Sequence, residues 1–138
     1  PSLDKTLSKS GIRAGDVYAA FLQGRSMLQA YQESTRVFHN IITIREDSQK
    51  VSFPQEQRFI FGFIDGCHQQ AYIENDFYVI WPHLVSGGAI GFHDYKYGDW
   101  PEVTEAADKL MHEHKTEITE GYEIEGKYNI LSLLLIKK

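Results

Sequence analysis

The apolar run at residues 58–64 (RFIFGFI) limits the folds open to this chain more than any other segment. Its large apolar residues follow one another directly instead of alternating with polar ones. A strand covered on both faces has this pattern, and such strands are typical of parallel sheets in α/β proteins. The run ends at Asp65 and Gly66, and His68 follows soon after. The segment therefore predicts a buried strand with polar chemistry at its carboxyl end.

Strands and helices are predicted to alternate along the rest of the chain, because β-branched runs alternate with apolar residues at helical spacing. The sequence predicts a strand over 38–47, a helix over 72–84, a strand over 89–95, a helix from Pro101, and strands over 116–125 and 129–138. The SGG triplet at 86–88 is predicted to end the first of these helices as a turn before the next strand.

Residues 16–31 fit two interpretations. The spacing of their apolar residues is roughly helical, with Asp16 as a candidate N-cap. A central Gly24 weakens a continuous helix. The alternative is a short strand (VYAAFL), a glycine turn and a helix from Ser26. The sequence leaves both open.

We therefore predict an α/β fold: a mostly parallel sheet with helices on both faces and a C-terminal antiparallel hairpin. The 138 residues are enough for one domain with a core, so residues 1–138 are expected to form a single domain. In such sheets ligands bind at the carboxyl ends of the strands.

The composition of the chain argues against some classes of binding partner. The formal net charge is −5, which argues against nucleic acid or an anionic membrane as the main partner. No apolar run approaches the ~20 residues that span a bilayer. The one cysteine, Cys67, fits a reducing compartment, so we expect a cytoplasmic protein. Oligomeric state is open, although an apolar sheet edge would favour a homo-oligomer.

Two acids are predicted to meet at the sheet edge. Asp65 ends one predicted strand and Asp94 ends the next, and neighbouring strands lie ~4.8 Å apart. Paired carboxylates repel unless a proton or cation sits between them, and their oxygens favour Mg²⁺, Ca²⁺ or Mn²⁺. His93 and His68 could reach the same place, and a histidine can take a proton from a hydroxyl near neutral pH. Taken alone, Asp-Gly after a strand is also a common turn.

Taken together, residues 41–110 resemble a class I S-adenosylmethionine-dependent methyltransferase, with its Rossmann-like fold. They look most like the branch that includes the macrocin O-methyltransferases and cephalosporin-biosynthesis-type proteins. The resemblance rests on a set of short motifs, namely Asp65-Gly66-x-His68, Trp81-Pro82-x-Leu84, Gly87-Gly88, His93-Asp94-Tyr95, and Pro101 with Val103.

The resemblance implies roles for particular residues. Asp65, His93 and Asp94 stand where metal-dependent members hold Mg²⁺, and His68 stands where they have the base. Further upstream, two segments resemble the family's cofactor-binding segments, "REDS" at 45–48 and "YAAFLQGRS" at 18–26. By that resemblance the residues beside S-adenosylmethionine are Gly24, Ser26, Asp47 and Ser48.

The cofactor half departs from the family's pattern. Tyr18 stands where the family has Glu, and Ala20 stands where it has a glycine that lets the backbone approach the cofactor. Between Ser26 and Ile41 there is room for one helix, where the family fits a strand and a further helix. These departures are typical of a fragment, a deletion variant, or a domain that has lost cofactor binding.

Three functions remain open at this point. The first is a methyltransferase acting on a hydroxyl of a sugar or small natural product with a divalent metal. The second is a non-catalytic methyltransferase-like domain that binds a partner chain. The third is a metal-dependent hydrolase that uses the same acids without a nucleotide cofactor.

Overall fold

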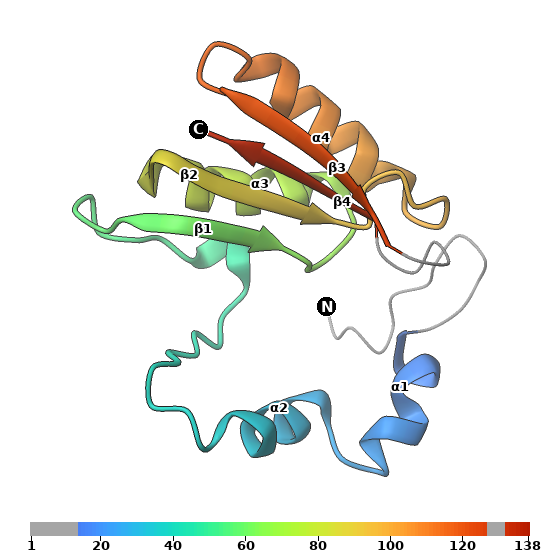
Figure 1. The fold of residues 1–138 in the computed structure, drawn as a ribbon. Helices are drawn as coiled ribbons and strands as arrows, with labels where there is room; N and C mark the ends of the chain where they lie inside the picture. Colours follow the sequence, from blue (N-terminus) through green and yellow to red (C-terminus); the bar gives the residue numbers. More distant parts are fainter. Residues whose placement is uncertain (1–13, 127–131) are drawn as a thin grey trace. The chain divides into compact units, whose positions relative to one another are not determined.

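The computed structural model describes residues 14–126 and 132–138 (Figure 1). The chain divides into two compact units, residues 1–46 and 47–138. Within the described residues, no helix combines the length and the apolar character that crossing a membrane requires. The prediction of a single domain over 1–138 stays a prediction.

From residue 14 onward, the first unit contains two helices, α1 (Ala14–Leu22) and α2 (Met27–Thr35). The turn between them includes Gly24, whose φ of 82° lies in the left-handed region. Ser26 is the N-cap of α2: its hydroxyl accepts the Gln29 N–H at 3.2 Å, and its own N–H donates to Gln29 Oε1 at 2.8 Å. The structure thus combines the two interpretations of 16–31, with helix on both sides of the glycine turn.

The predicted strand over 38–47 is wrong. These residues form bends and irregular backbone, and Ile42 is 91% exposed. A β-branched run becomes a strand only where a neighbouring strand pairs with its backbone. Among the described residues, no strand pairs with this segment.

The second unit is built on a four-stranded sheet. Its elements are η2 (Ser48–Lys50), β1 (Phe59–Ile64), α3 (Gln70–Ile80), η3 (Trp81–His83), β2 (Leu84–His93), α4 (Pro101–Glu113), β3 (Glu120–Glu125) and β4 (Ser132–Lys137). The strand order is β1-β2-β4-β3. Only β1 and β2 are parallel, because β4 returns antiparallel to β2 and pairs with β3 as the predicted hairpin. A mostly parallel sheet is therefore not confirmed.

Helices α3 and α4 lie side by side behind the sheet in Figure 1. Their buried faces meet one face of the strands, where Ile90 and Phe92 of β2 are fully buried. Residues that point the other way from β1 are open, since Phe61 and Phe63 are 54% and 46% exposed. Helices on both faces are therefore not confirmed within residues 47–138, and the described residues of this unit cover the run 58–64 on one side only.

Two glycines in the SGG triplet belong to β2 and not to a turn before it, so that part of the prediction is wrong. Gly87 has a φ of 79°, and the register with β1 shifts there, since Phe59 pairs with Leu84 but Phe61 pairs with Ala89. The residues of β2 left unpaired by this shift are bonded on the side of β4, because the Gly87 N–H donates to the carbonyl of Lys138, which directly follows β4, at 2.8 Å. A bulge therefore takes the place of the predicted turn.

Close packing joins α3 to the sheet at Gly62. A Cβ added there would lie 2.7 Å from Cγ2 of Ile80 in α3. The N-terminus of α3 is in turn held by α4, because the Gln70 N–H donates to Glu102 Oε2 at 2.8 Å. These contacts fix the loop between β1 and α3, which carries Asp65 and His68.

Candidate functional site

The two acids meet as predicted. Asp65 directly follows β1, Asp94 directly follows β2, and the strands are parallel neighbours with Ile64 paired to Phe92. The carboxyl ends of both strands therefore lie at one edge of the sheet. A small hollow at this edge is lined by Asp65, His68 and His93, among others.

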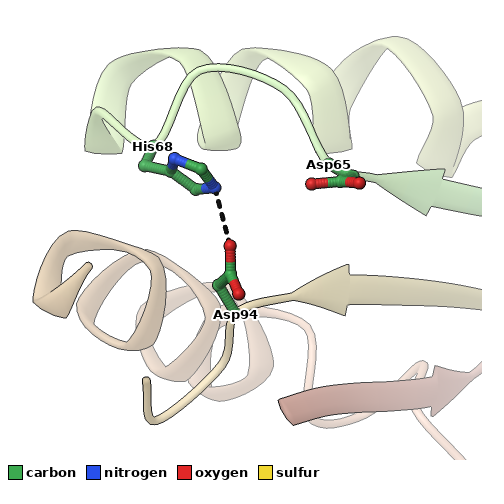
Figure 2. Close-up of side chains that lie close together, drawn as sticks. All are labelled: Asp65, His68 and Asp94. Atoms are coloured by element: carbon green, nitrogen blue, oxygen red, sulfur yellow. Dashed lines mark ion pairs between the residues drawn. The ribbon is translucent and has the colours of Figure 1, made fainter. Parts of the chain in front are cut away.

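Four side chains converge at this edge. His68 Nε2 lies 3.0 Å from Asp94 Oδ2, and Figure 2 shows this ion pair with Asp65 beside it at the end of β1. His93 Nδ1 lies 3.2 Å from Asp65 Oδ1 and 3.2 Å from Asp94 Oδ2. One ligand atom from each of Asp65, His68 and Asp94 lies within 4.8 Å of the others. His68, the residue predicted as the base, thus also falls in the group with metal-binding geometry.

These side chains differ in their contact with solvent. The side chains of Asp94 and His68 are 14% and 17% exposed, whereas Asp65 is 50% exposed. His68 Nε2 and His93 Nδ1 are themselves buried, and among the described residues neither has a hydrogen bond of good geometry. Each nitrogen is close to a carboxylate oxygen without being aligned with it. Buried polar atoms left this way are costly unless something else binds them.

Opposing effects act on Asp94. Burial raises the pKa of its carboxyl, but the adjacent imidazole of His68, followed by that of His93, more than offsets this, so the pKa is lowered overall. The carboxylate is therefore ionised at neutral pH and available as a ligand.

The backbone that carries Asp94 is strained. Asp94 and Lys96 have φ values of 58° and 60°, which non-glycine residues seldom adopt. Helix α4 holds the turn in place: Tyr95 donates its hydroxyl to Asp108 Oδ1 at 2.7 Å, and the Lys96 N–H donates to the Thr104 hydroxyl at 2.8 Å. This left-handed backbone, held by α4, positions the Asp94 carboxylate beside the end of β1.

The donor set fits a divalent cation. Two carboxylates supply negative charge, and two imidazole nitrogens that lack aligned partners point to the same place. Oxygen ligands suit Mg²⁺, Ca²⁺ and Mn²⁺, whereas imidazole ligands are more usual for transition metals such as Zn²⁺ and Fe²⁺. Mn²⁺ is the one of the three oxygen-favouring ions that is also a transition metal. A mixed set of this kind favours Mn²⁺ over Mg²⁺.

The four residues predicted beside the cofactor fall in both units. Gly24 lies in the turn after α1, and Ser26 caps α2. Asp47 caps η2 by accepting the Gln49 N–H at 3.1 Å, and Ser48 begins that turn of helix. Two of the four side chains thus have local structural roles, and their role toward a cofactor stays a prediction.

Sequence reasoning missed Trp100. Its ring stacks on His68, with ring centroids 4.3 Å apart and planes 19° apart. A signal was available, because Trp100 directly precedes Pro101 at the predicted helix start, close in sequence to Asp94. Nothing in the spacing showed that its ring would reach His68.

Comparison with known proteins identifies the family. A family model described as a methyltransferase domain matches residues 9–95. A search of curated proteins found no match. Among solved structures, the chain is similar to that of the O-methyltransferase NovP, with a TM-score of 0.60 and 13% sequence identity.

That similarity covers all of this chain and 55% of the NovP chain, so the chain spans little more than half of its structural relative. At this identity the likeness shows the shared fold, which is methyltransferase-like, with a mixed sheet and helices. The family match covers more than half of the sequence, and the chain therefore belongs to this methyltransferase-domain family.

Proposed function

We propose that this domain transfers a methyl group from S-adenosylmethionine to a hydroxyl of a small molecule, such as a sugar or small natural product, with the help of a divalent cation. The observation that carries the proposal is the meeting of Asp65, Asp94 and two buried imidazole nitrogens at the edge of a methyltransferase sheet. The likeness to NovP, an O-methyltransferase, supports oxygen as the atom that is methylated.

Asp65, His93 and Asp94 would hold the cation. His93 Nδ1 lies 3.2 Å from an oxygen of each acid, which places it between them. When bound, the cation supplies positive charge that lowers the pKa of a nearby hydroxyl. Residues around the site need only orient the hydroxyl toward the methyl group, since alignment accounts for much of the rate in such transfers.

His68 is the base in this proposal. Its Nε2 faces the same space as the carboxylates and would accept the proton that leaves the acceptor hydroxyl. Meanwhile the oxygen forms its new bond to the methyl carbon, whose bond to sulfur breaks. Asp94 stabilises the imidazolium that results, because its carboxylate lies 3.0 Å away.

The first test separates ligands from base. Mn²⁺ binding, followed by electron paramagnetic resonance, should weaken at least tenfold in Asp65→Asn, Asp94→Asn and His93→Ala. His68→Ala should bind Mn²⁺ normally and lose methyl transfer, whereas Glu105→Gln on the exposed face of α4 is the matched control. Loss of Mn²⁺ binding in His68→Ala would make His68 a ligand, as its place in the three-residue group allows.

A second candidate is a methyltransferase-like module without catalytic activity that binds a partner chain. The irregular backbone at 38–47 favours it, because the segment predicted to form a strand beside the cofactor forms none. Calorimetric titration with S-adenosylhomocysteine, with and without Mg²⁺, separates the two. Micromolar binding supports the enzyme, and lack of binding under both conditions supports the module. We also propose that the protein is cytoplasmic and forms a homo-oligomer. Sedimentation velocity measures the oligomeric state.

A further inference from the structure

The loop after β2 brings an aromatic ring onto the proposed base. Trp100 and His68 stack with centroids 4.3 Å apart and an angle of 19° between their planes. His68 lies on the loop between β1 and α3, and Trp100 lies 32 positions later, at the start of α4. The imidazole therefore has a carboxylate at one edge and an indole over one face.

Trp100 is itself held firmly. Its backbone N–H donates to the Tyr97 backbone carbonyl at 3.0 Å, and its backbone carbonyl accepts the Val103 N–H at 3.1 Å. Pro101 at the first position of α4 keeps the backbone of Trp100 out of the helical region, and the observed φ and ψ are −128° and 62°. The indole also packs against the core formed by the helices and the sheet. A ring anchored in this way can restrict the one stacked on it.

His68 needs such a restraint, because its ion pair with Asp94 fixes one atom only. That pair holds Nε2 at 3.0 Å from the carboxylate but leaves the imidazole plane able to rotate about that point. The hydrogen-bond geometry at Nε2 is poor, so alignment with the carboxylate does not fix the plane either. Stacking on a rigid indole fixes the plane.

We propose that Trp100 is a positioning residue, which holds the His68 imidazole in the plane that directs Nε2 into the site. This inference rests on the proposed function, since it assigns Trp100 to the base of that reaction. It also links the base to α4: any movement of the N-terminus of α4 moves the surface on which His68 rests.

The test measures the His68 ring directly, in the full chain labelled with ¹³C-histidine. In the wild type, the carbon-bound ring protons of His68 should be shifted upfield by the indole, and the order parameter of the ring should approach the value of a rigid backbone, about 0.85. Trp100→Leu keeps an apolar side chain but removes the stack, so the order parameter should fall below about 0.6. Trp100→Phe keeps an aromatic ring and should restore most of the rigidity.

Tyr97→Leu is the matched control, because it removes an aromatic ring from the same loop and leaves the stack in place. It should resemble the wild type. A rigid His68 ring in folded Trp100→Leu would overturn the proposal, as would Trp100→Phe being as mobile as Trp100→Leu. If Trp100→Leu does not fold, an unshifted His68 spectrum in the wild type would overturn it on its own.

Methyl transfer gives a separate result. None of the ring measurements needs a cofactor, a metal or an acceptor, so a chain without methyltransferase activity still decides the role of Trp100 toward His68. Conversely, a rigid stack in a chain that fails to bind S-adenosylhomocysteine would reject the proposed function and leave the positioning intact.

Discussion

Gly62→Ala tests the packing that sets β1, and hence Asp65, against α3. The new Cβ would lie 2.7 Å from Ile80 Cγ2 and 3.3 Å from Ile90 Cγ1. Ile80 is β-branched and has little rotamer freedom in a helix, so its methyl group cannot swing away without moving α3. Overpacking of this kind costs about 1–3 kcal/mol. Replacing a glycine in a strand with alanine by itself stabilises the folded state by about 0.5–1 kcal/mol.

The net loss in the free energy of unfolding should therefore lie between about 0 and 2.5 kcal/mol, with a central value of about 1 kcal/mol, measured by urea unfolding followed by circular dichroism. Gly121→Ala in β3 is the control, because the atom nearest to its new Cβ, Ile136 Cγ2, would lie 4.0 Å away, and this change should cause no loss. Ile80→Leu removes the Cγ2 methyl group, so combining it with Gly62→Ala should recover most of the loss. Equal stability of the two alanine variants would refute the packing argument.

Two further predictions concern α4. Glu102→Ala removes the carboxylate that accepts the Gln70 N–H at the start of α3, and should lower the free energy of unfolding by about 1 kcal/mol, measured in urea. The control is Glu105→Ala on the same helix, which should lower it by less. Lys109→Met removes the hydrogen bond that lowers the pKa of Glu74 against the effect of burial. Because the pKa of Glu74 is lower in the folded state, its carboxylate stabilises the fold at pH values above the ordinary pKa of 4.5, and this effect is lost as the pH falls through the folded pKa. The difference in the free energy of unfolding between the wild type and Lys109→Met should therefore be largest at neutral pH and disappear in acid. A gap of equal size at pH 7 and about pH 3 would contradict this reasoning.

The elements predicted correctly from the sequence are those with local signals. Pro101 and the apolar residues spaced after it predict α4, and residues 116–125 and 129–138 predict the hairpin of β3 and β4. Residues 38–47 carry a strand-like composition without a partner strand, which the sequence of the segment itself cannot show. The SGG triplet is similar, because its place in β2 depends on pairing with Lys138, far along the chain.

The site divides in the same way. The meeting of Asp65 and Asp94 required only that two strands end in acids and lie side by side, and the strand-end rule was enough to predict it. The stacking of Trp100 on His68 depends on how a loop folds back on α4, through the left-handed backbone at Asp94 and the Tyr95 hydrogen bond to Asp108. Those contacts follow from the folded structure and have no counterpart in residue spacing.

The strand order also governs how this chain can fold as it is synthesised. In the order β1-β2-β4-β3, the strand made last lies between two that are made earlier. β3 pairs with β4, so it has no place in the sheet until β4 has left the ribosome. Helices α3 and α4 can pack on β1 and β2 before that, but Leu134 and Ile136 of β4 are needed to complete their core. Cooperative folding of residues 47–138 must therefore wait for the end of the β4 segment, and an earlier pause in translation would leave β2 with an unpaired edge.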